Sequence, residues 1–118
     1  MPLTIGLTGM DPATETALKS SLMAANERLN GLWRIVPEAE AQHVIVDMDS
    51  MYGPMSWLRL HAAGKKVIGL TSAPLTQTDF RLGRPFDEAA VTELLAGIAA
   101  GAFIALKALA LAMGGGFL

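Results

Sequence analysis

The sequence contains no cysteine, which excludes disulfide bonds and metal sites built on thiolates. It also has little net charge, because 9 Lys and Arg residues against 11 Asp and Glu residues give −2 at pH 7. The only adjacent basic residues, Lys65 and Lys66, are interpreted as the solvated edge of a strand. We therefore expect no nucleic-acid partner. The first residues lack the basic segment of a signal peptide, and together with the missing cysteines this favours a cytoplasmic protein.

Motifs that carry catalytic chemistry are missing as well. The sequence has no Gly-rich phosphate loop, no nucleophile elbow around a serine and no pair of carboxylates at catalytic spacing. His43 and His61 lack a second ligand at metal-binding spacing, and Trp33 and Trp57 are interpreted as packing residues. We therefore expect no enzyme activity, no cofactor and no metal.

The 118 residues are 52% hydrophobic, which suits one domain with a real core. Strands and helices alternate along the chain, so we expect a parallel sheet with right-handed crossovers. The predicted fold class is α/β, a doubly wound parallel sheet of five strands in the order 2-1-3-4-5. We expect strands at residues 3–7, 32–36, 43–49, 67–72 and 80–82, helices at residues 12–29, 54–63 and from Glu88 onward, and one helical turn at residues 38–42.

Polar residues gather where the predicted strands end. In such a sheet, ligands and reactive groups collect at the carboxyl ends of the central strands. The first strand leads to Asp11, the third to Asp47 and Asp49, the fourth to Thr71, and the fifth to Arg84. These five residues form the candidate pocket.

The order of these strand ends resembles the receiver domains of response regulators, the CheY-like family. The stretch VIVDMDSM is similar to the family's phospho-acceptor segment, VIGLTSA to the segment that ends in the switch Thr or Ser, and RPFDEAAVTELL to the Lys-Pro-Phe turn and last helix. The resemblance covers about residues 3–100. It implies that Asp47 stands at the acceptor position, Thr71 at the switch position, and Arg84 in place of the lysine.

Several positions depart from the family pattern. The family holds Mg²⁺ with two acidic residues after the first strand, and here Gly9 and Met10 stand there, with Asp11 next to them. The aromatic switch position falls on Arg81, beside Phe80. The link between the fourth and fifth strands is too short for the usual fourth helix, so we expect that helix to be shortened or missing.

The simplest interpretations of the pocket residues involve no phosphate. Asp47 then caps backbone amides or pairs with Arg84, Asp49 is a turn residue, and Thr71 is a strand-end hydroxyl. The leading hypothesis is an atypical, phosphorylation-independent receiver-like signalling domain that acts through protein–protein interaction or dimerisation. One alternative is a regulatory domain that binds a small ligand or nucleotide second messenger through Arg84 and Arg81. Another is a phospho-accepting receiver that uses Asp47, with a metal site rearranged around Asp11, Asp47 and Asp49.

The C-terminal part of the sequence continues where a receiver would end. We divide the chain into a receiver-like domain, residues 1–101, and an apolar helical extension, residues 102–118. Residues 94–113 are apolar except for Lys107, and such a helix needs a cover. Self-association is the first interpretation; a membrane span or anchor over residues 94–113, or folding back onto the sheet, is the alternative. Small residues at helical spacing and their apolar neighbours form the predicted interface: Gly97, Gly101, Ile104, Ala105 and Leu109.

Overall fold

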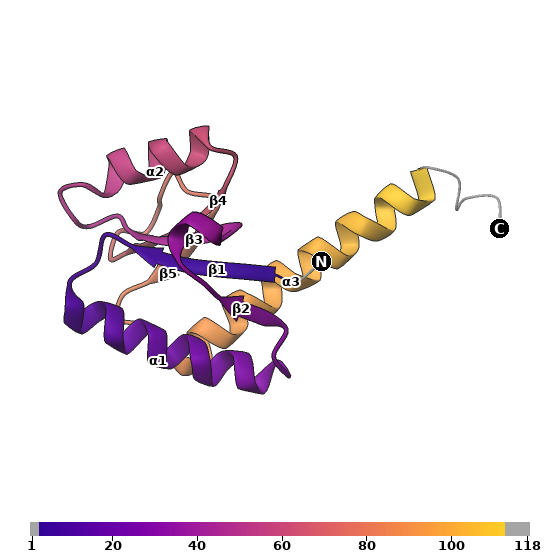
Figure 1. The fold of residues 1–118 in the computed structure, drawn as a ribbon, viewed down its shortest axis with the longest axis horizontal. Coiled ribbons are helices and arrows are strands. Elements are labelled where there is room, and N and C mark those ends of the chain that lie inside the picture. Colours follow the sequence, from indigo (N-terminus) through magenta and orange to yellow (C-terminus); the bar gives the residue numbers. More distant parts are fainter. Residues whose placement is uncertain (1–2, 113–118) are drawn as a thin grey trace.

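The computed structural model describes the backbone of residues 3–112 and the side chains of residues 3–101. Figure 1 shows a sheet with helices on both faces and one helix that continues away from it. Along the chain the elements are β1 (Leu3–Thr8), α1 (Pro12–Arg28), β2 (Trp33–Ile35), the 3₁₀ turn η1 (Glu38–Glu40), β3 (His43–Asp47), α2 (Gly53–Ala62), β4 (Lys66–Thr71), β5 (Phe80–Gly83) and α3 (Glu88–Ala112).

The five strands pair in parallel in the order β2-β1-β3-β4-β5, which confirms the predicted topology. The element bounds differ from the predicted ones by one or two residues. The largest differences are two residues: η1 ends at Glu40 and not at residue 42, and β3 ends at Asp47 and not at Asp49. The Asp47 side chain accepts a hydrogen bond from the backbone N–H of Asp49 at 3.0 Å, and this local bond turns the chain out of the strand.

Local signals in the sequence determine where α1 begins and ends. The Asp11 carboxylate caps the helix by accepting from the backbone N–H of Thr14 at 2.7 Å, and Pro12 occupies the first turn, where its missing N–H costs nothing. After the helix, Asn30 and Gly31 adopt left-handed backbone angles with φ of 59° and 71°. These two residues turn the chain toward β2.

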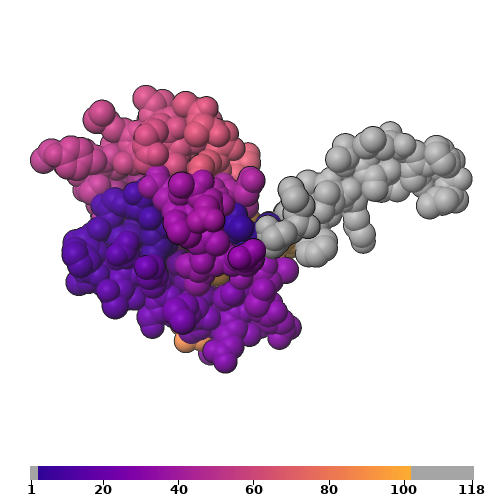
Figure 2. Space-filling model, in the orientation of Figure 1, coloured from indigo at the N-terminus to yellow at the C-terminus, as the bar shows by residue number. Residues whose placement is uncertain are grey.

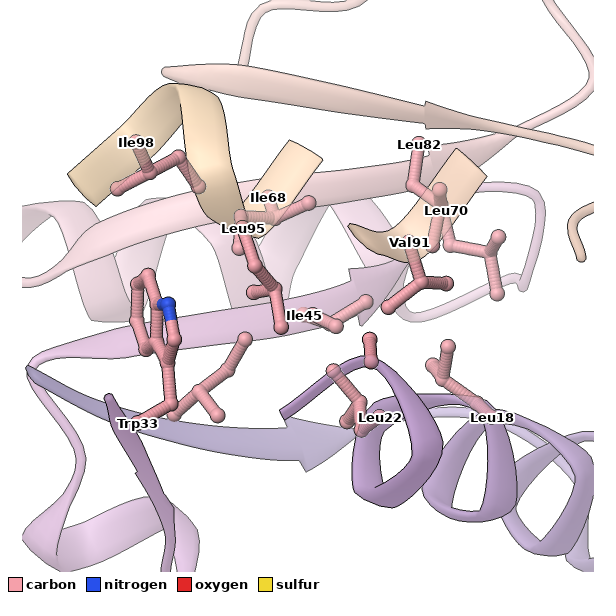
Figure 3. Packing of buried hydrophobic residues seen from close by; sticks show 12 residues of the cluster. Leu18, Leu22, Trp33, Ile45, Ile68, Leu70, Leu82, Val91, Leu95 and Ile98 are labelled. Carbon is pink, nitrogen blue, oxygen red and sulfur yellow. The ribbon is translucent and has the colours of Figure 1, made fainter. Parts of the chain in front are cut away.

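Helices α1 and α3 cover one face of the sheet. At their ends, Arg28 of α1 forms an ion pair with Glu88 of α3. Figure 3 shows side chains from both helices and from the strands pointing into one apolar cluster. The buried members of this cluster are Ile5, Leu18, Leu22, Ala25, Trp33, Ile45, Ile68, Leu70, Leu82, Val91, Leu95 and Ile98.

Helix α2 covers the opposite face, where a smaller cluster is buried. Val44 and Val46 of β3 point to this cluster while Ile45 points to the other, as the twofold alternation of a strand requires. Leu60 of α2 and Val67 of β4 complete its buried part with Ala41. In the space-filling view, side chains around β2 and η1 cover the near edge of the sheet, between α1 and α2 (Figure 2).

No helix lies between β4 and β5 in the described chain, which confirms the expected loss of the fourth helix. The connecting residues 72–79 instead fold over β4 at Gly69. A Cβ atom added to Gly69 would lie 2.6 Å from the Thr78 hydroxyl and 3.0 Å from the Thr76 hydroxyl. The loop therefore covers part of the face that α2 leaves open, and it packs closely because residue 69 has no side chain.

Helix α3 runs past the sheet as far as Ala112, whereas residues 113–118 of the predicted extension lie outside the described residues. It begins after Asp87, whose side chain accepts from the backbone N–H of Ala90 at 2.8 Å. Its first turns pack on the sheet, and its backbone then continues away from the domain to Ala112 (Figure 1). Within residues 3–101, no helix has the length and apolar character needed to cross a membrane.

Candidate functional site

A polar cluster lies at the carboxyl ends of β3 and β4 and just after β5. Asp47 is the last residue of β3, Thr71 is the last residue of β4, and Arg84 directly follows β5. The turn after β3 adds Asp49, and the residue after β4 adds Ser72. The parallel pairing of the three strands brings these residues together at one edge of the sheet.

Asp47 is the most buried charged group of the cluster, with a side chain only 9% exposed. Both of its carboxylate oxygens face the Arg84 guanidinium, with Nη1 at 2.9 Å from Oδ1 and Nη2 at 3.3 Å from Oδ2. The backbone N–H of Asp49 also donates to Oδ1. A two-pronged pair of this kind is stronger and better oriented than a single-point contact. The carboxylate at the predicted acceptor position is thus engaged on both oxygens.

Asp49 is held by more donors than a turn residue needs. One oxygen accepts from the Thr71 hydroxyl at 2.7 Å. The other accepts from the backbone N–H and the hydroxyl of Ser72 at 3.0 and 3.1 Å, and from Arg84 Nη1 at 3.2 Å. The Thr71 hydroxyl first, then the Ser72 N–H and Arg84, lower the pKa of Asp49 to about 2, although partial burial opposes them. Asp49 is therefore a carboxylate at neutral pH.

Arg84 links the two carboxylates. Its Nη1 lies within hydrogen-bonding distance of both Asp47 and Asp49, and its side chain is 25% exposed. Burial acts to lower the pKa of Arg84, but the bonds and charges of the two aspartates raise it above its ordinary value. The guanidinium is a permanent cation between two anions, and the peptide bond that follows it, to Pro85, is cis.

Asp11 is the one predicted pocket residue that does not join the cluster. Its carboxylate caps α1, and the hydrogen bonds from Thr14 lower the pKa of Asp11. Among the described residues, no hydrogen bond or ion pair links it to Asp47, Asp49 or Arg84. The sequence placed Asp11 near the pocket because it follows β1, but its capping bond directs the carboxylate to the helix.

The residues present do not fit a magnesium site. Magnesium needs carboxylate oxygens that are free to coordinate it. Here the oxygens of Asp47 and Asp49 accept hydrogen bonds from the protein, and a cation already lies between the two side chains. Gly9 and Met10, which follow β1, offer no carboxylate oxygen. Residues 3–101 contain no group of three or more His, Asp or Glu side chains placed to hold a metal.

The two arginines that a small ligand would use are both engaged. Arg84 pairs with Asp47 and Asp49, and Arg81 donates from Nε to the backbone oxygen of Ala73 at 2.8 Å. A shallow groove of about 450 Å³ lies beside Arg84, but its other lining residues offer a single polar side chain, Thr14. The groove is lined by Ala13, Thr14, Ala17, Arg84, Pro85 and Phe86. No observation favours the nucleotide-binding alternative.

Two polar residues have roles that sequence reasoning did not assign to them. Ser72 supplies two of the four donors to Asp49, and its place directly after Thr71 at a strand end was the available signal. Lys65 was interpreted as a solvated edge, which is wrong. Its half-buried Nζ donates to the backbone oxygens of Glu38, Ala39 and Ala41 at 2.7, 3.2 and 2.9 Å, and so closes the end of η1.

The histidines and tryptophans lie outside the cluster. His43 packs edge-on against Trp33, with ring centroids 5.1 Å apart, and burial lowers the pKa of His43. His61 stacks on Trp57 at 5.5 Å. Trp33 is 2% exposed and belongs to the larger core, as the packing interpretation predicts.

The strand order, the helices on both faces and the strand-end cluster together define the receiver fold. No family model matches the sequence, and no curated protein matches it. Among solved structures, the chain is similar to the receiver domain of the sensor histidine kinase PA1611 from Pseudomonas aeruginosa PAO1. The match has a TM-score of 0.56 at 16% sequence identity, and it covers 80% of this chain and 95% of that one. The crystal structure of that relative has a magnesium ion coordinated in its active-site cleft.

Proposed function

We propose that this chain is a receiver-like signalling module that works without phosphorylation and acts through protein–protein contacts. The observation that carries the proposal is the state of Asp47. A carboxylate that attacks a phosphoryl group needs a free oxygen and a cation to neutralise the incoming charge. Asp47 is 9% exposed, and both of its oxygens are paired with Arg84. Asp49 adds a second negative charge beside it, which repels a phosphoryl group.

Incubation with a small-molecule phosphodonor and Mg²⁺ tests this proposal directly. We expect the intact mass of the protein to remain unchanged, because Asp47 offers no free oxygen and the residues around it do not fit the metal. A phosphorylatable receiver domain treated in parallel shows that the donor is active, and an Asp47→Asn variant accounts for reaction at other positions. Stoichiometric phosphate on wild-type Asp47 would contradict the proposal.

We further propose that α3 supplies the contact, as a helix that pairs with a second copy of this chain. Val91, Leu95 and Ile98 on one side of the helix are buried in the core. Gly97 and Gly101 lie on another side, exposed, with no atom within 4 Å of an added Cβ. Such a strip allows another helix to approach closely. The predicted contacts Ile104, Ala105 and Leu109 lie outside the residues whose side chains the structure describes.

The apolar part of α3 that follows residue 101 needs another surface to pack against. From residue 102 to Ala112 the backbone continues for about 16 Å, at 1.5 Å per residue. The sequence of this stretch is AFIALKALALA, in which Lys107 is the one charged residue. An apolar helix exposed on all sides is unfavourable in water, so pairing with an identical helix supplies the missing burial.

Light scattering on shortened chains tests the self-association. We expect the full chain to be a dimer and a chain ending at residue 101 to be a monomer, because truncation removes the apolar part of α3. A chain lacking only residues 113–118 is the matched control and is expected to remain a dimer. Gly101→Leu provides a second test without truncation, since a Cβ added there meets no described atom outside its own helix backbone within 4 Å. A monomeric full chain, or association that depends on detergent, would contradict the proposal.

A further inference from the structure

The donors around Asp49 form an anion-binding position. They comprise one backbone N–H, two hydroxyls and one guanidinium, and all four lie between 2.7 and 3.2 Å from the carboxylate oxygens. Donors of these kinds bind both carboxylates and phosphates, because both present oxygen atoms that carry negative charge. The donors come from the end of β4 and from the residue after β5, whereas the anion comes from the turn after β3.

Asp49 enters this position from the solvent side. Its side chain is 31% exposed, against 9% for Asp47, so Asp49 lies nearer to the surface than Asp47. Its carboxylate spans Thr71 on one oxygen and Ser72 with Arg84 on the other. A small oxyanion arriving from solution would meet the same donors and would have to displace this side chain.

We propose that Asp49 is a tethered ligand, whose carboxylate fills an oxyanion site that the crevice would otherwise offer to phosphate or to a small carboxylate. The inference rests on the proposed phosphorylation-independent function, because a crevice that had to admit a phosphoryl group could not keep its own carboxylate there. The donor set is then occupied in every folded molecule. Removal of the Asp49 carboxylate leaves the four donors facing solvent, ready to bind an external oxyanion.

Rescue of an Asp49→Ala variant by added anions tests the inference. The melting temperature is measured in sodium phosphate, sodium formate and sodium chloride at equal ionic strength. At about ten times the dissociation constant, a bound oxyanion raises the melting temperature by at least about 3 °C over chloride. We expect the variant to show this rise in phosphate or in formate beyond any rise in the wild type, which shows only the general effect of each salt on stability. The salt that gives the larger rise in melting temperature identifies the oxyanion that the site prefers.

Two controls isolate the donor set. Asp79→Ala removes a carboxylate that accepts a single backbone bond, from Val67 at 2.8 Å, so no anion rescue is expected there. Adding Thr71→Val to Asp49→Ala removes one of the four donors and is expected to abolish most of the rescue. If Asp49→Ala does not fold, Asp49→Ser leaves a comparable opening and keeps a residue that favours turns.

An Asp49 variant that responds to neither phosphate nor formate overturns the inference. A wild-type protein that responds as strongly as the variant overturns it too, because the site would not be filled. These outcomes differ from failure of the proposed function. Phosphate appearing on wild-type Asp47 would refute that function even if the variant is rescued, and an unrescued variant leaves the wild-type mass experiment unaffected.

Discussion

Replacing Arg84 by methionine is expected to lower the free energy of unfolding by about 2–4 kcal/mol. The substitution keeps an unbranched apolar stem but removes the cation between Asp47 and Asp49. Asp47, at 9% exposure, then has a charge that is neither paired nor well hydrated. The expected loss is smaller than for a fully buried ion pair, because Arg84 is 25% exposed. Water can therefore partly hydrate the Asp47 charge once the guanidinium is gone. Urea denaturation followed by circular dichroism measures the change.

Two further variants separate the charge from its geometry. Arg84→Lys keeps the charge but presents it at one point, so the two-pronged pair with Asp47 is lost and an intermediate destabilisation is expected. Adding Asp47→Asn to Arg84→Met removes the unpaired charge and is expected to recover part of the loss. If Arg84→Met costs less than about 0.5 kcal/mol, the pair behaves like an exposed surface pair and the account of Asp47 given above is wrong.

Replacing Gly53 by alanine is expected to destabilise the fold by about 3 kcal/mol. Gly53 begins α2 and lies against the end of β3. An added Cβ would lie 2.4 Å from the backbone oxygen of Asp47 and 2.8 Å from the Cα of Met48, and both atoms belong to backbone that cannot rotate away. Either α2 or the turn after β3 must shift. Urea denaturation gives the stability, and the amide spectrum of residues 47–53 reports the displacement.

Gly97→Ala is the matched control for that substitution. Gly97 is exposed within α3, and an added Cβ meets no atom within 4 Å. The variant is compared in the chain that ends at residue 101, which lacks most of the proposed dimer contact. Alanine favours a helix over glycine, so the substitution is expected to gain about 0.5–1 kcal/mol there. The change from glycine to alanine is thus expected to lower the stability of the fold at position 53 and to raise it at position 97. Equal effects at both would show that the close approach of Gly53 to β3 does not constrain the fold.

The fold could be predicted in detail because its signals are local. The run HVIVD is apolar on both faces and forms the central strand β3, and Asp11 with Pro12 determines the start of α1. The missing fourth helix followed from the length of the link between β4 and β5. What covers the exposed β4 could not be predicted, because the packing of Thr76 and Thr78 on Gly69 depends on the path of an irregular loop.

The sequence predicted which residues form most of the candidate site, but not which hydrogen bonds they make. Asp47, Asp49, Thr71 and Arg84 come together because parallel strands end at one edge, and that rule needs only the strand assignment. Which oxygen accepts from which donor depends on side-chain conformations across three strands. Asp49 therefore appeared to be a simple turn residue, although it accepts from Thr71, Ser72 and Arg84. The capping role of Asp11 rests on a local bond to Thr14, which engages its carboxylate at the start of α1.

The position of Arg84 has a consequence for the edge of the sheet. β5 is an edge strand of four residues and pairs with the sheet on one side only. Arg84 follows it directly, so detachment of β5 withdraws the cation and leaves Asp47 and Asp49 as neighbouring like charges. Fraying at this edge is therefore opposed by electrostatic repulsion that develops elsewhere, at the end of β3. Two carboxylates near the middle of the sheet in this way keep its outermost strand in place.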